Sequence, residues 1–459
     1  MFKHIPCGET LPPKNVHAVS VSIPTYDDII SYEEGNCDAI KSGYPRFVLH
    51  PYLKKMTVFL KDKYALSSKE EIVLVSSKKF ATLICITYNL EQQKEFDEVF
   101  GVVLIEKNSK DLQKVLRFIQ HVGCNLSSRF AEEYLYDRGL IESLYVESID
   151  KPKYVLETLR DAYRNDDIYL TCSGMNAMYG VLKALQEIRG GIVIQLGWIY
   201  LDSMNLIESY ESKIFYDVED LDVLEEFLKN NNKKISSLVT ELPTNPLLQC
   251  VDVKRLKKIC LKYDISLVID STFSTSYGKI TEADILVESL TKFACGNADV
   301  LMGCFVLNQK YAKHREKFLS HIDKPYIKDV KRLAYEIKDY KKRVEKSKKN
   351  AERLVEFLKQ KSFVKRVYYS EFSPVISVEF NFHFKEAYDK LNFAKGPSLG
   401  TEFTLLMPYV YLAHYDLLTC QEGREILDQN GIPIDLIRIS VGIEDIEDIK
   451  KEFNRLDLW

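Results

Sequence analysis

Two stretches decide the fold of this chain: ISLVIDSTF (residues 265–273) and ADILVESLTK (residues 283–292). Each is a short, continuous apolar run that ends in polar residues, which is typical of a strand buried on both faces of a sheet. Earlier runs of the same kind alternate with helical patterns or turns; they are DIYLTC (167–172), GIVIQL (191–196) and KISSLVT (234–240). This alternation predicts an α/β fold with a mainly parallel sheet that helices cover on both faces.

The pattern changes on either side of this region and predicts four parts. Residues 1–60 are rich in turn residues and read as an extended arm, which needs another surface to lie on. Residues 61–165 form an α/β segment, in which EIVLV, ATLICIT and VFGVVLIE predict strands and DLQKVLRFIQHVG predicts an amphipathic helix. Residues 166–330 form the large domain. Residues 331–459 begin with a long basic helix over 331–361, continue with alternating strands, and predict a smaller α+β domain.

The composition excludes several broad classes of protein. The chain has 459 residues, which is enough for two or three domains. Hydrophobic residues make up 46% and charged residues 28%, so the chain is too apolar to be disordered. The net charge of −4 argues against a nucleic-acid partner. Since no apolar run approaches the length of a membrane span and no signal-peptide pattern is visible, we expect a cytoplasmic protein with no membrane contact.

The metal-ligating residue types do not cluster in the sequence. The ten cysteines include no C-x-x-C pair, and most lie in apolar stretches, so we interpret them as buried free thiols in a reducing compartment. The eight histidines show no ligand spacing, and we therefore predict no metal site.

Polar residues follow the predicted strands at the edge where ligands bind to parallel sheets. Ser173, Gly174 and Met175 come after one strand and open a helical run, which is a turn that suits a phosphate, although many such turns bind nothing. Asn245 lies between two prolines in ELPTNP (241–246), which can aim its amide or can simply form a rigid loop.

A carboxylate and an amine complete this set. Asp270 ends one apolar run, where a charge is costly unless it is paired or hydrogen-bonded, and Lys292 follows the next run. Each could be an ordinary structural polar group. Together, a lysine, a carboxylate and a phosphate-type turn are what pyridoxal phosphate needs for its covalent attachment, its ring nitrogen and its phosphate. We therefore predict pyridoxal phosphate as the cofactor.

These motifs, in this order, resemble the Cys/Met-metabolism family of pyridoxal-phosphate enzymes, which have the type I fold. The matching segments span nearly the whole chain; they are YPR (44–46), SGM (173–175), ELPTNP (241–246), VIDSTF (268–273), SLTK (289–292), SLG (398–400) and LIRISVGIED (436–445). The opening HAVSVSIPTYDD (17–28), the stretch LGWIY (196–200) and the long insertion look most like the fungal-type cystathionine γ-synthase branch of that family.

The resemblance implies roles for the residues around the cofactor. Lys292 would be the Schiff-base lysine and proton shuttle, Asp270 would pair with the ring nitrogen, and Asn245 would bond the phenolic oxygen. The backbone of Gly174 and Met175 would hold the phosphate. The hydroxyls of Ser289 and Thr291 would also hold the phosphate, and Thr272 would line the cofactor site.

The resemblance also implies roles in substrate binding and assembly. Arg438 would hold the substrate α-carboxylate, with Ser398 nearby. Tyr44 and Arg46 would reach the cofactor phosphate of a neighbouring subunit, which makes the active unit at least a homodimer, or a homotetramer, with shared sites. The family's ring-stacking tyrosine motif is absent, and Trp198 or Tyr200 is the candidate to replace it.

The function that follows from the resemblance is a γ-replacement that joins cysteine to an activated homoserine ester and gives cystathionine. O-acyl-homoserine sulfhydrylase and cystathionine or methionine lyase activities are alternatives on the same scaffold, because pocket shape rather than these motifs sets the substrate. A non-catalytic scaffold with this fold is an alternative of another class, and an intact Lys292, Asp270 and Arg438 set argues against it.

Overall fold

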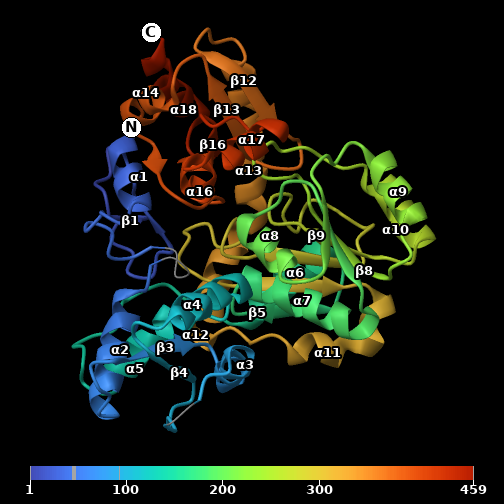
Figure 1. The fold of residues 1–459 in the computed structure, drawn as a ribbon. Coiled ribbons are helices and arrows are strands. Elements are labelled where there is room, and N and C mark those ends of the chain that lie inside the picture. Colours follow the sequence, from blue (N-terminus) through green and yellow to red (C-terminus); the bar gives the residue numbers. More distant parts are fainter. Residues whose placement is uncertain (1, 44–47, 92–93, 458–459) are drawn as a thin grey trace.

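The computed structural model describes residues 2–43, 48–91 and 94–457 (Figure 1). Its centre is a seven-stranded sheet in the order β5-β11-β10-β9-β8-β6-β7. The strands are β5 (Ile168–Thr171), β6 (Ile192–Leu196), β7 (Ser212–Phe215), β8 (Ile235–Glu241), β9 (Ser266–Asp270), β10 (Ile285–Ser289) and β11 (Gly303–Leu307). Only β11 runs against its neighbours in this sheet. The predicted α/β fold with a mainly parallel sheet is confirmed.

Helices pack on both faces of this sheet, as buried apolar strands require. The helices on one face are α7 (Gly174–Arg189), α8 (Leu201–Glu208) and α11 (Arg315–Ser320). The helices on the other face are α6 (Lys153–Tyr163), α9 (Leu221–Asn230), α10 (Val253–Lys262) and α12 (Ile327–Glu336). Asp252 caps α10, since its side chain accepts a hydrogen bond from the Arg255 N–H. A 3₁₀ turn, η1 (Gln309–His314), precedes α11.

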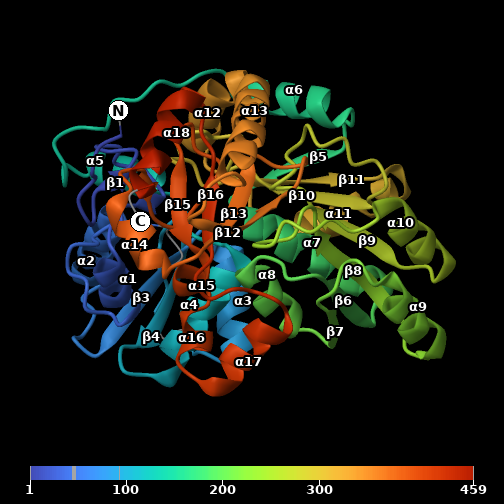
Figure 2. The same ribbon diagram turned by 90° about the horizontal axis from the view of Figure 1, so that it is seen from above.

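A five-stranded sheet organises the C-terminal part, in the order β12-β13-β16-β15-β14. The strands are β12 (Val364–Tyr369), β13 (Val375–Phe380), β14 (Ala394–Lys395), β15 (Leu405–Pro408) and β16 (Ile437–Ser440). The helices around them are α13 (Tyr340–Leu358), α14 (Phe384–Lys390), α15 (Tyr409–Ala413), α16 (Tyr415–Leu418), α17 (Gln421–Gln429) and α18 (Ile446–Phe453), followed by the 3₁₀ turn η3 (Asn454–Leu456). Figure 2 shows this part between the central sheet on one side and the N-terminal elements on the other.

The long helix that we predicted over 331–361 is two helices. α12 ends at Glu336, the 3₁₀ turn η2 (Ile337–Asp339) follows, and α13 begins at Tyr340. The Arg343 guanidinium donates a hydrogen bond of 2.6 Å to the Glu336 carbonyl oxygen, which has lost its helical partner at this break. None of the described helices is both long enough and apolar enough to cross a membrane.

The N-terminal arm contains more regular structure than we predicted. Its elements are β1 (Thr10–Leu11), β2 (Ser20–Val21), α1 (Tyr26–Glu33) and α2 (Pro51–Lys63). The described part of the arm lies on its own chain: the Val19 N–H donates to the Ala298 carbonyl oxygen at 2.7 Å, and the Ile23 N–H donates to the Lys395 carbonyl oxygen at 2.9 Å. The arm therefore connects the large and small domains of one molecule.

The segment over 61–165 is built around a separate two-stranded sheet. Its elements are β3 (Glu70–Val75), α3 (Lys78–Tyr88), β4 (Gly101–Glu106), α4 (Lys110–Val122) and α5 (Ser128–Tyr136), and they precede α6. The predicted strand ATLICIT is wrong, because these residues form α3. Phe80, Ala81 and Ile84 are buried while Ile86 is exposed, which is one-sided helical burial. An apolar run this short is compatible with a strand or a helix. Only the packing, with one face buried and the other exposed, shows that it is a helix.

A buried ion cluster joins this segment to the large domain. Arg129 of α5 is 2% exposed and donates to both carboxylate oxygens of Glu147 at 2.6 Å. Its other nitrogen donates to the Asp299 carbonyl oxygen at 2.6 Å and to Asp329 at 3.0 Å. The Arg129 guanidinium also lies 3.8 Å from the Asp299 Oδ2, so it pairs with acids from three parts of the chain, and it shares Glu147 and Asp299 with Arg332.

Replacing this cation should destabilise the whole protein. Arg129→Met keeps much of the side-chain volume but leaves the buried Asp329 without its cation, while Arg332 remains beside Asp299 and Glu147, so we expect the free energy of unfolding to fall by about 3 kcal/mol in urea unfolding. Lys328→Met is the matched control. It removes a partly exposed cation that pairs with Glu133 at 2.9 Å, and it should cost less than about 1 kcal/mol. Equal effects of the two changes would contradict this account.

Candidate active site

A cavity of about 680 Å³ opens at the carboxyl edge of the central sheet, where the large domain, the small domain, the arm and α4 meet. This central cavity has the size of ordinary small-molecule sites. Nine of the residues that the sequence nominated line it, and they come from segments far apart in the chain. They are Gly174, Met175, Asn245, Asp270, Thr272, Ser289, Lys292, Ser398 and Arg438.

Lys292 lies just beyond β10, and its position is fixed from the small domain. Its Nζ donates a hydrogen bond of 3.0 Å to the Ser398 Oγ. The loop that carries Ser398 presses against the backbone of the lysine: a Cβ on Gly400 would lie 2.7 Å from the Lys292 carbonyl carbon and 2.5 Å from the next backbone nitrogen. Gly400 also has a φ of 81°, so glycine is required there for two reasons.

Asp270 ends β9 as a buried carboxylate. Its Oδ1 accepts a hydrogen bond of 2.8 Å from the Thr272 N–H, and the Thr272 Oγ1 in turn accepts one of 2.9 Å from the Ser289 N–H. Burial raises the pKa of Asp270, although the bonds from Thr272 oppose the shift. Asp270 makes no ion pair with any described residue, so a cationic ring N–H in the cavity would supply the charge that this carboxylate lacks.

The turn before α7 leaves room for an anion. Ser173 caps the helix by accepting a hydrogen bond of 3.0 Å from the Asn176 N–H. A Cβ on Gly174 would lie 2.7 Å from the Ser289 Cβ and 2.9 Å from its Oγ, so only glycine keeps the space between the helix N-terminus and this hydroxyl open. Backbone N–H groups at a helix N-terminus, together with a hydroxyl, suit a phosphate.

Arg438 of β16 is a buried cation that faces the same cavity. It is 6% exposed, and it donates to the Asn245 Oδ1 at 3.1 Å and to the Ser398 carbonyl oxygen at 3.0 Å. Burial lowers the pKa of Arg438 to about 10, which still leaves it charged at neutral pH. No carboxylate among the described residues forms an ion pair with it. The guanidinium therefore suits an anion that arrives with a ligand.

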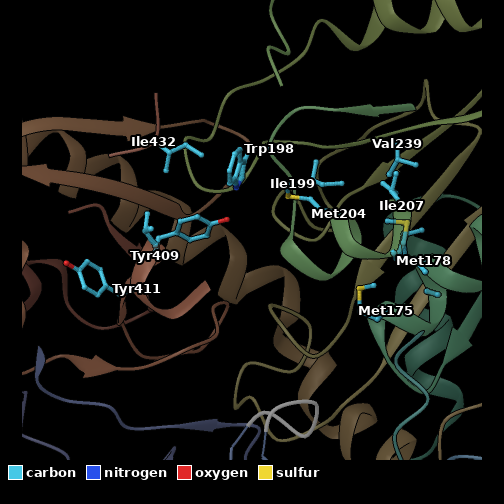
Figure 3. Close-up of a cluster of buried hydrophobic side chains, with 14 of the residues drawn as sticks. Met175, Met178, Trp198, Ile199, Met204, Ile207, Val239, Tyr409, Tyr411 and Ile432 are labelled. Atoms are coloured by element: carbon cyan, nitrogen blue, oxygen red, sulfur yellow. The ribbon is translucent and has the colours of Figure 1, made fainter. Parts of the chain in front are cut away.

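Two nominated residues, Trp198 and Thr291, are placed differently, and two others fall outside the described residues. Trp198 does not line the cavity: its indole N–H donates to the His414 Nε2 at 3.3 Å inside a buried cluster, where Figure 3 shows it near Tyr409. Thr291 is fully buried, and its hydroxyl exchanges hydrogen bonds with the backbone of Met302. Tyr44 and Arg46 lie outside the described residues, although Gly43 and Val48, on either side of that segment, line this cavity of their own chain.

A second buried carboxyl group, that of Glu241, lies beside Asp270, and the sequence analysis assigns it no role. Tyr200 is named there only as an alternative to Trp198. Glu241 pairs in register with Asp270 across β8 and β9 and is 4% exposed. Its Oε1 accepts a hydrogen bond of 2.7 Å from the Tyr200 N–H, while its Oε2 has no hydrogen-bond partner within the described ranges. Burial and the neighbouring Asp270 raise the pKa of Glu241 well above its usual range. The signal was available, since Glu241 ends an apolar run as Asp270 does.

Tyr200 is the aromatic side chain that Glu241 helps to place. Its hydroxyl donates to the Asp202 Oδ2 at 2.7 Å, so the backbone and the ring are each held, and Tyr200 lines the cavity. Of the two aromatic candidates in the LGWIY stretch, Tyr200 is the one that the structure brings to the cavity wall.

The donor set as a whole fits pyridoxal phosphate. It contains an amine, a buried carboxylate without a cation, an open anion cradle at a helix N-terminus and a buried guanidinium for an acidic ligand. An α/β fold that gathers these groups at the carboxyl edge of its sheet defines a pyridoxal-phosphate enzyme of the type I fold class.

Comparison with known proteins gives the family. The Cys/Met metabolism PLP-dependent enzyme family matches residues 152–456, and the chain belongs to it. A dechlorinase/desaturase of L-2-amino-4-chloropent-4-enoate from Streptantibioticus cattleyicolor is 33% identical over 96% of each chain. The cystathionine gamma-synthase of Saccharomyces cerevisiae is 23% identical over 98% of each chain. The family match begins at α6, so the arm and most of the 61–165 segment lie outside it.

Solved structures agree on the fold. The cystathionine gamma-lyase CalE6 from Micromonospora echinospora superposes with a TM-score of 0.59 at 22% identity, over 70% of this chain and 94% of that one. A cystathionine gamma-lyase from Lactobacillus plantarum gives a TM-score of 0.56 at 21% identity, over 65% and 83% of the two chains.

A methyl group at position 174 should weaken cofactor binding. In Gly174→Ala the new Cβ would occupy the space beside Ser289, so we expect the affinity for pyridoxal phosphate to fall by at least about tenfold, measured by titrating the apoprotein. Unchanged far-UV circular dichroism would confirm that the fold is retained. Wild-type affinity in this variant would show that the cradle is not the phosphate site.

Glu241 should make the stability of the apoprotein fall as the pH rises. Because its pKa is raised on folding, the folded chain keeps a proton that the unfolded chain releases above about pH 4.3, and the stabilisation is lost as the pH climbs towards the folded value. Glu241→Gln mimics the neutral acid, so its melting temperature should decline less than that of the wild type between about pH 5 and about pH 8. The exposed Glu345→Gln should keep the wild-type slope. A wild-type slope in Glu241→Gln would refute the raised pKa.

Proposed function

We propose that the chain catalyses a γ-replacement in which the thiol of cysteine displaces the leaving group of an activated homoserine ester and gives cystathionine. The observation that carries the proposal is the buried guanidinium of Arg438, which has no acidic partner among the described residues and faces the same cavity as the Lys292 amine. An amino acid supplies both an anion for the arginine and a carbon acid beside the lysine.

Arg438 binds and orients the substrate. Asn245 and the Ser398 carbonyl oxygen hold the guanidinium as neutral acceptors, so its charge remains available to a carboxylate, which it can bind through two parallel hydrogen bonds. A carboxylate held in this way fixes the substrate Cα relative to Lys292. Ser398 touches both side chains, through its carbonyl oxygen and its hydroxyl.

Lys292 moves the protons of the reaction. When bound, pyridoxal phosphate supplies an electron sink that makes the substrate Cα–H acidic. The Lys292 amine removes the proton from Cα and, on the same side of the substrate, exchanges protons at the next carbon, so that the γ-substituent can leave. Asp270 would pair its buried carboxylate with the ring nitrogen of the bound cofactor and so favour the charged ring.

The relatives support chemistry at the γ-carbon. Two relatives, from Saccharomyces cerevisiae and Neurospora crassa, are named cystathionine gamma-synthase, and this name refers to a reaction at the γ-carbon. The dechlorinase/desaturase is named for L-2-amino-4-chloropent-4-enoate, in which the chlorine is also bonded to the γ-carbon. The extent and identity of the dechlorinase/desaturase match favour elimination without an added thiol as a second candidate. Sulfhydrylase and cystathionine or methionine lyase activities belong to the same set of alternatives.

We also propose that the active form is a cytoplasmic homodimer or homotetramer. The support is the family resemblance of the Tyr44 and Arg46 motif, which in the family serves the phosphate of a neighbouring subunit. Amino acids are the small-molecule partners in this proposal.

Removing the amine should abolish the chemistry but not the fold. We expect Lys292→Ala to lose the yellow absorbance band of lysine-bound pyridoxal phosphate and at least about 1,000-fold in turnover, because no other described amine lines the cavity. Lys346→Ala, an exposed lysine of α13, should retain both. A wild-type protein that takes up no pyridoxal phosphate would leave only a non-catalytic scaffold.

The donor and the acceptor are tested together. Acetyl-, succinyl- and phospho-homoserine are each offered with and without cysteine, and cystathionine and the released leaving group are measured. Cystathionine formation supports the γ-replacement. Release of the leaving group without any cystathionine, or chloride release from L-2-amino-4-chloropent-4-enoate alone, would replace it with elimination.

A further inference from the structure

The same cavity is lined by a second set of charged side chains, distinct from the groups assigned above. We propose that this second set binds the second amino acid of the reaction, with Arg117 receiving its carboxylate and Glu33 and Asp416 receiving its ammonium group. The inference rests on the proposed γ-replacement and adds a site for the thiol-bearing co-substrate, which we call the mouth subsite.

The cation comes from the segment that precedes the family match. Gln113, Arg117 and Gln120 line the cavity from α4, and their spacing places them on one face of the helix. Arg117 makes no hydrogen bond or ion pair with a described residue. Since Arg438 and Lys292 are assigned to the first substrate, Arg117 is the cation that remains for a second anion among the described residues that line the cavity.

The acids come from the opposite side of the mouth subsite. Glu33 is the last residue of α1 and Asp416 lies in α16; Figure 1 shows these two helices on one side and α4 on the other. Neither carboxylate pairs with a cation in the described part of the chain. Burial, together with the charge of Asp416, raises the pKa of Glu33 to about 7, so a cation placed near both acids would relieve their repulsion.

Unpaired charges of both signs in one cavity indicate a zwitterion. If the cation and the acids were close enough to neutralise one another, they would form an ion pair, and they do not. A ligand that carries a carboxylate and an ammonium group on the same carbon matches both walls, whereas an anionic ester or a sulfide ion would leave one wall unused.

The walls of the mouth subsite are held rigidly. On one side the Gln120 Nε2 donates to the Asp202 Oδ1 at 2.8 Å, and Asp202 also holds the Tyr200 hydroxyl, so α4 is tied to the aromatic wall of the site. On the other side the Tyr26 N–H donates to Asp389 at 2.8 Å and fixes the start of α1 on the small domain. These bonds hold the two helices in place, so the charged side chains extend from fixed backbone positions.

A series of thiols tests the subsite. The holoenzyme, saturated with a homoserine ester, is given cysteine, cysteamine, 3-mercaptopropionate or sulfide, and kcat/KM for each thiol is measured. Arg117→Gln should lower the value about tenfold for cysteine and 3-mercaptopropionate and leave cysteamine and sulfide unchanged. Glu33→Gln combined with Asp416→Asn should do the same for cysteine and cysteamine and leave 3-mercaptopropionate and sulfide unchanged.

Two neighbouring variants are the controls. Lys114→Gln removes a cation from the same helix, where Lys114 pairs with Asp111 and does not line the cavity. Glu34→Gln removes the exposed acid next to Glu33, which also lies outside the cavity. Both should leave all four thiols unchanged.

The failures of the two proposals are distinguishable. An equal loss for all four thiols in Arg117→Gln, or a wild-type enzyme that uses sulfide and ignores cysteine, would overturn the mouth subsite and leave γ-carbon chemistry standing. No release of a leaving group from any ester with any thiol would overturn the proposed function, and the subsite with it.

Discussion

A guanidinium kept charged inside the protein is the constraint on which the rest of the site depends. Among the described residues, the hydrogen bonds of Arg438 go to neutral acceptors, which are the Asn245 amide oxygen, the Ser398 carbonyl oxygen and the Met407 sulfur, and a bare charge would be expensive there. The end of β8 and the loop before Gly400 must therefore hold fixed positions, and the same loop fixes Lys292. The hydrogen bonds that Arg438 requires thus fix the small domain relative to the large domain. The cavity between the two domains is preorganised to bind an anion.

The groups at the strand ends were predictable because the carboxyl ends of parallel strands share one edge. Asn245, Asp270 and Lys292 each follow an apolar run, and all three line one cavity. The same logic fails one residue away: Thr291 precedes Lys292, yet its hydroxyl is consumed by the Met302 backbone. In the turn after β6, Trp198 and Tyr200 are separated by one residue, and the path of the loop, which the sequence does not specify, sends only Tyr200 to the cavity.

The parts that could not be predicted depend on tertiary packing. The run that forms α3 has an apolar content that fits strand or helix equally, and only the sheet beside it decides. The polar face of α4 reads as a solvated surface, because nothing in DLQKVLRFIQHVG shows that Gln120 will meet Asp202, more than eighty residues further along the chain. Glu241 is different, since its place at the end of a buried run marks it in the same way as Asp270.

The junction between α4 and the turn before α7 has a consequence for the protein's architecture. Gly123 ends α4 with a φ of 71°, a Cβ there would lie 2.1 Å from the Ser173 Oγ, and that hydroxyl donates to the Gly123 carbonyl oxygen at 2.7 Å. The 61–165 segment and the anion cradle before α7 are therefore packed and hydrogen-bonded together. Deleting the segment, to match the shorter bacterial lyases, would expose the face of α7 that α4 covers. It would also remove the hydrogen bond that positions Ser173 at the N-terminus of α7. The shortened chain would therefore lack an ordered anion cradle and would be a defective enzyme.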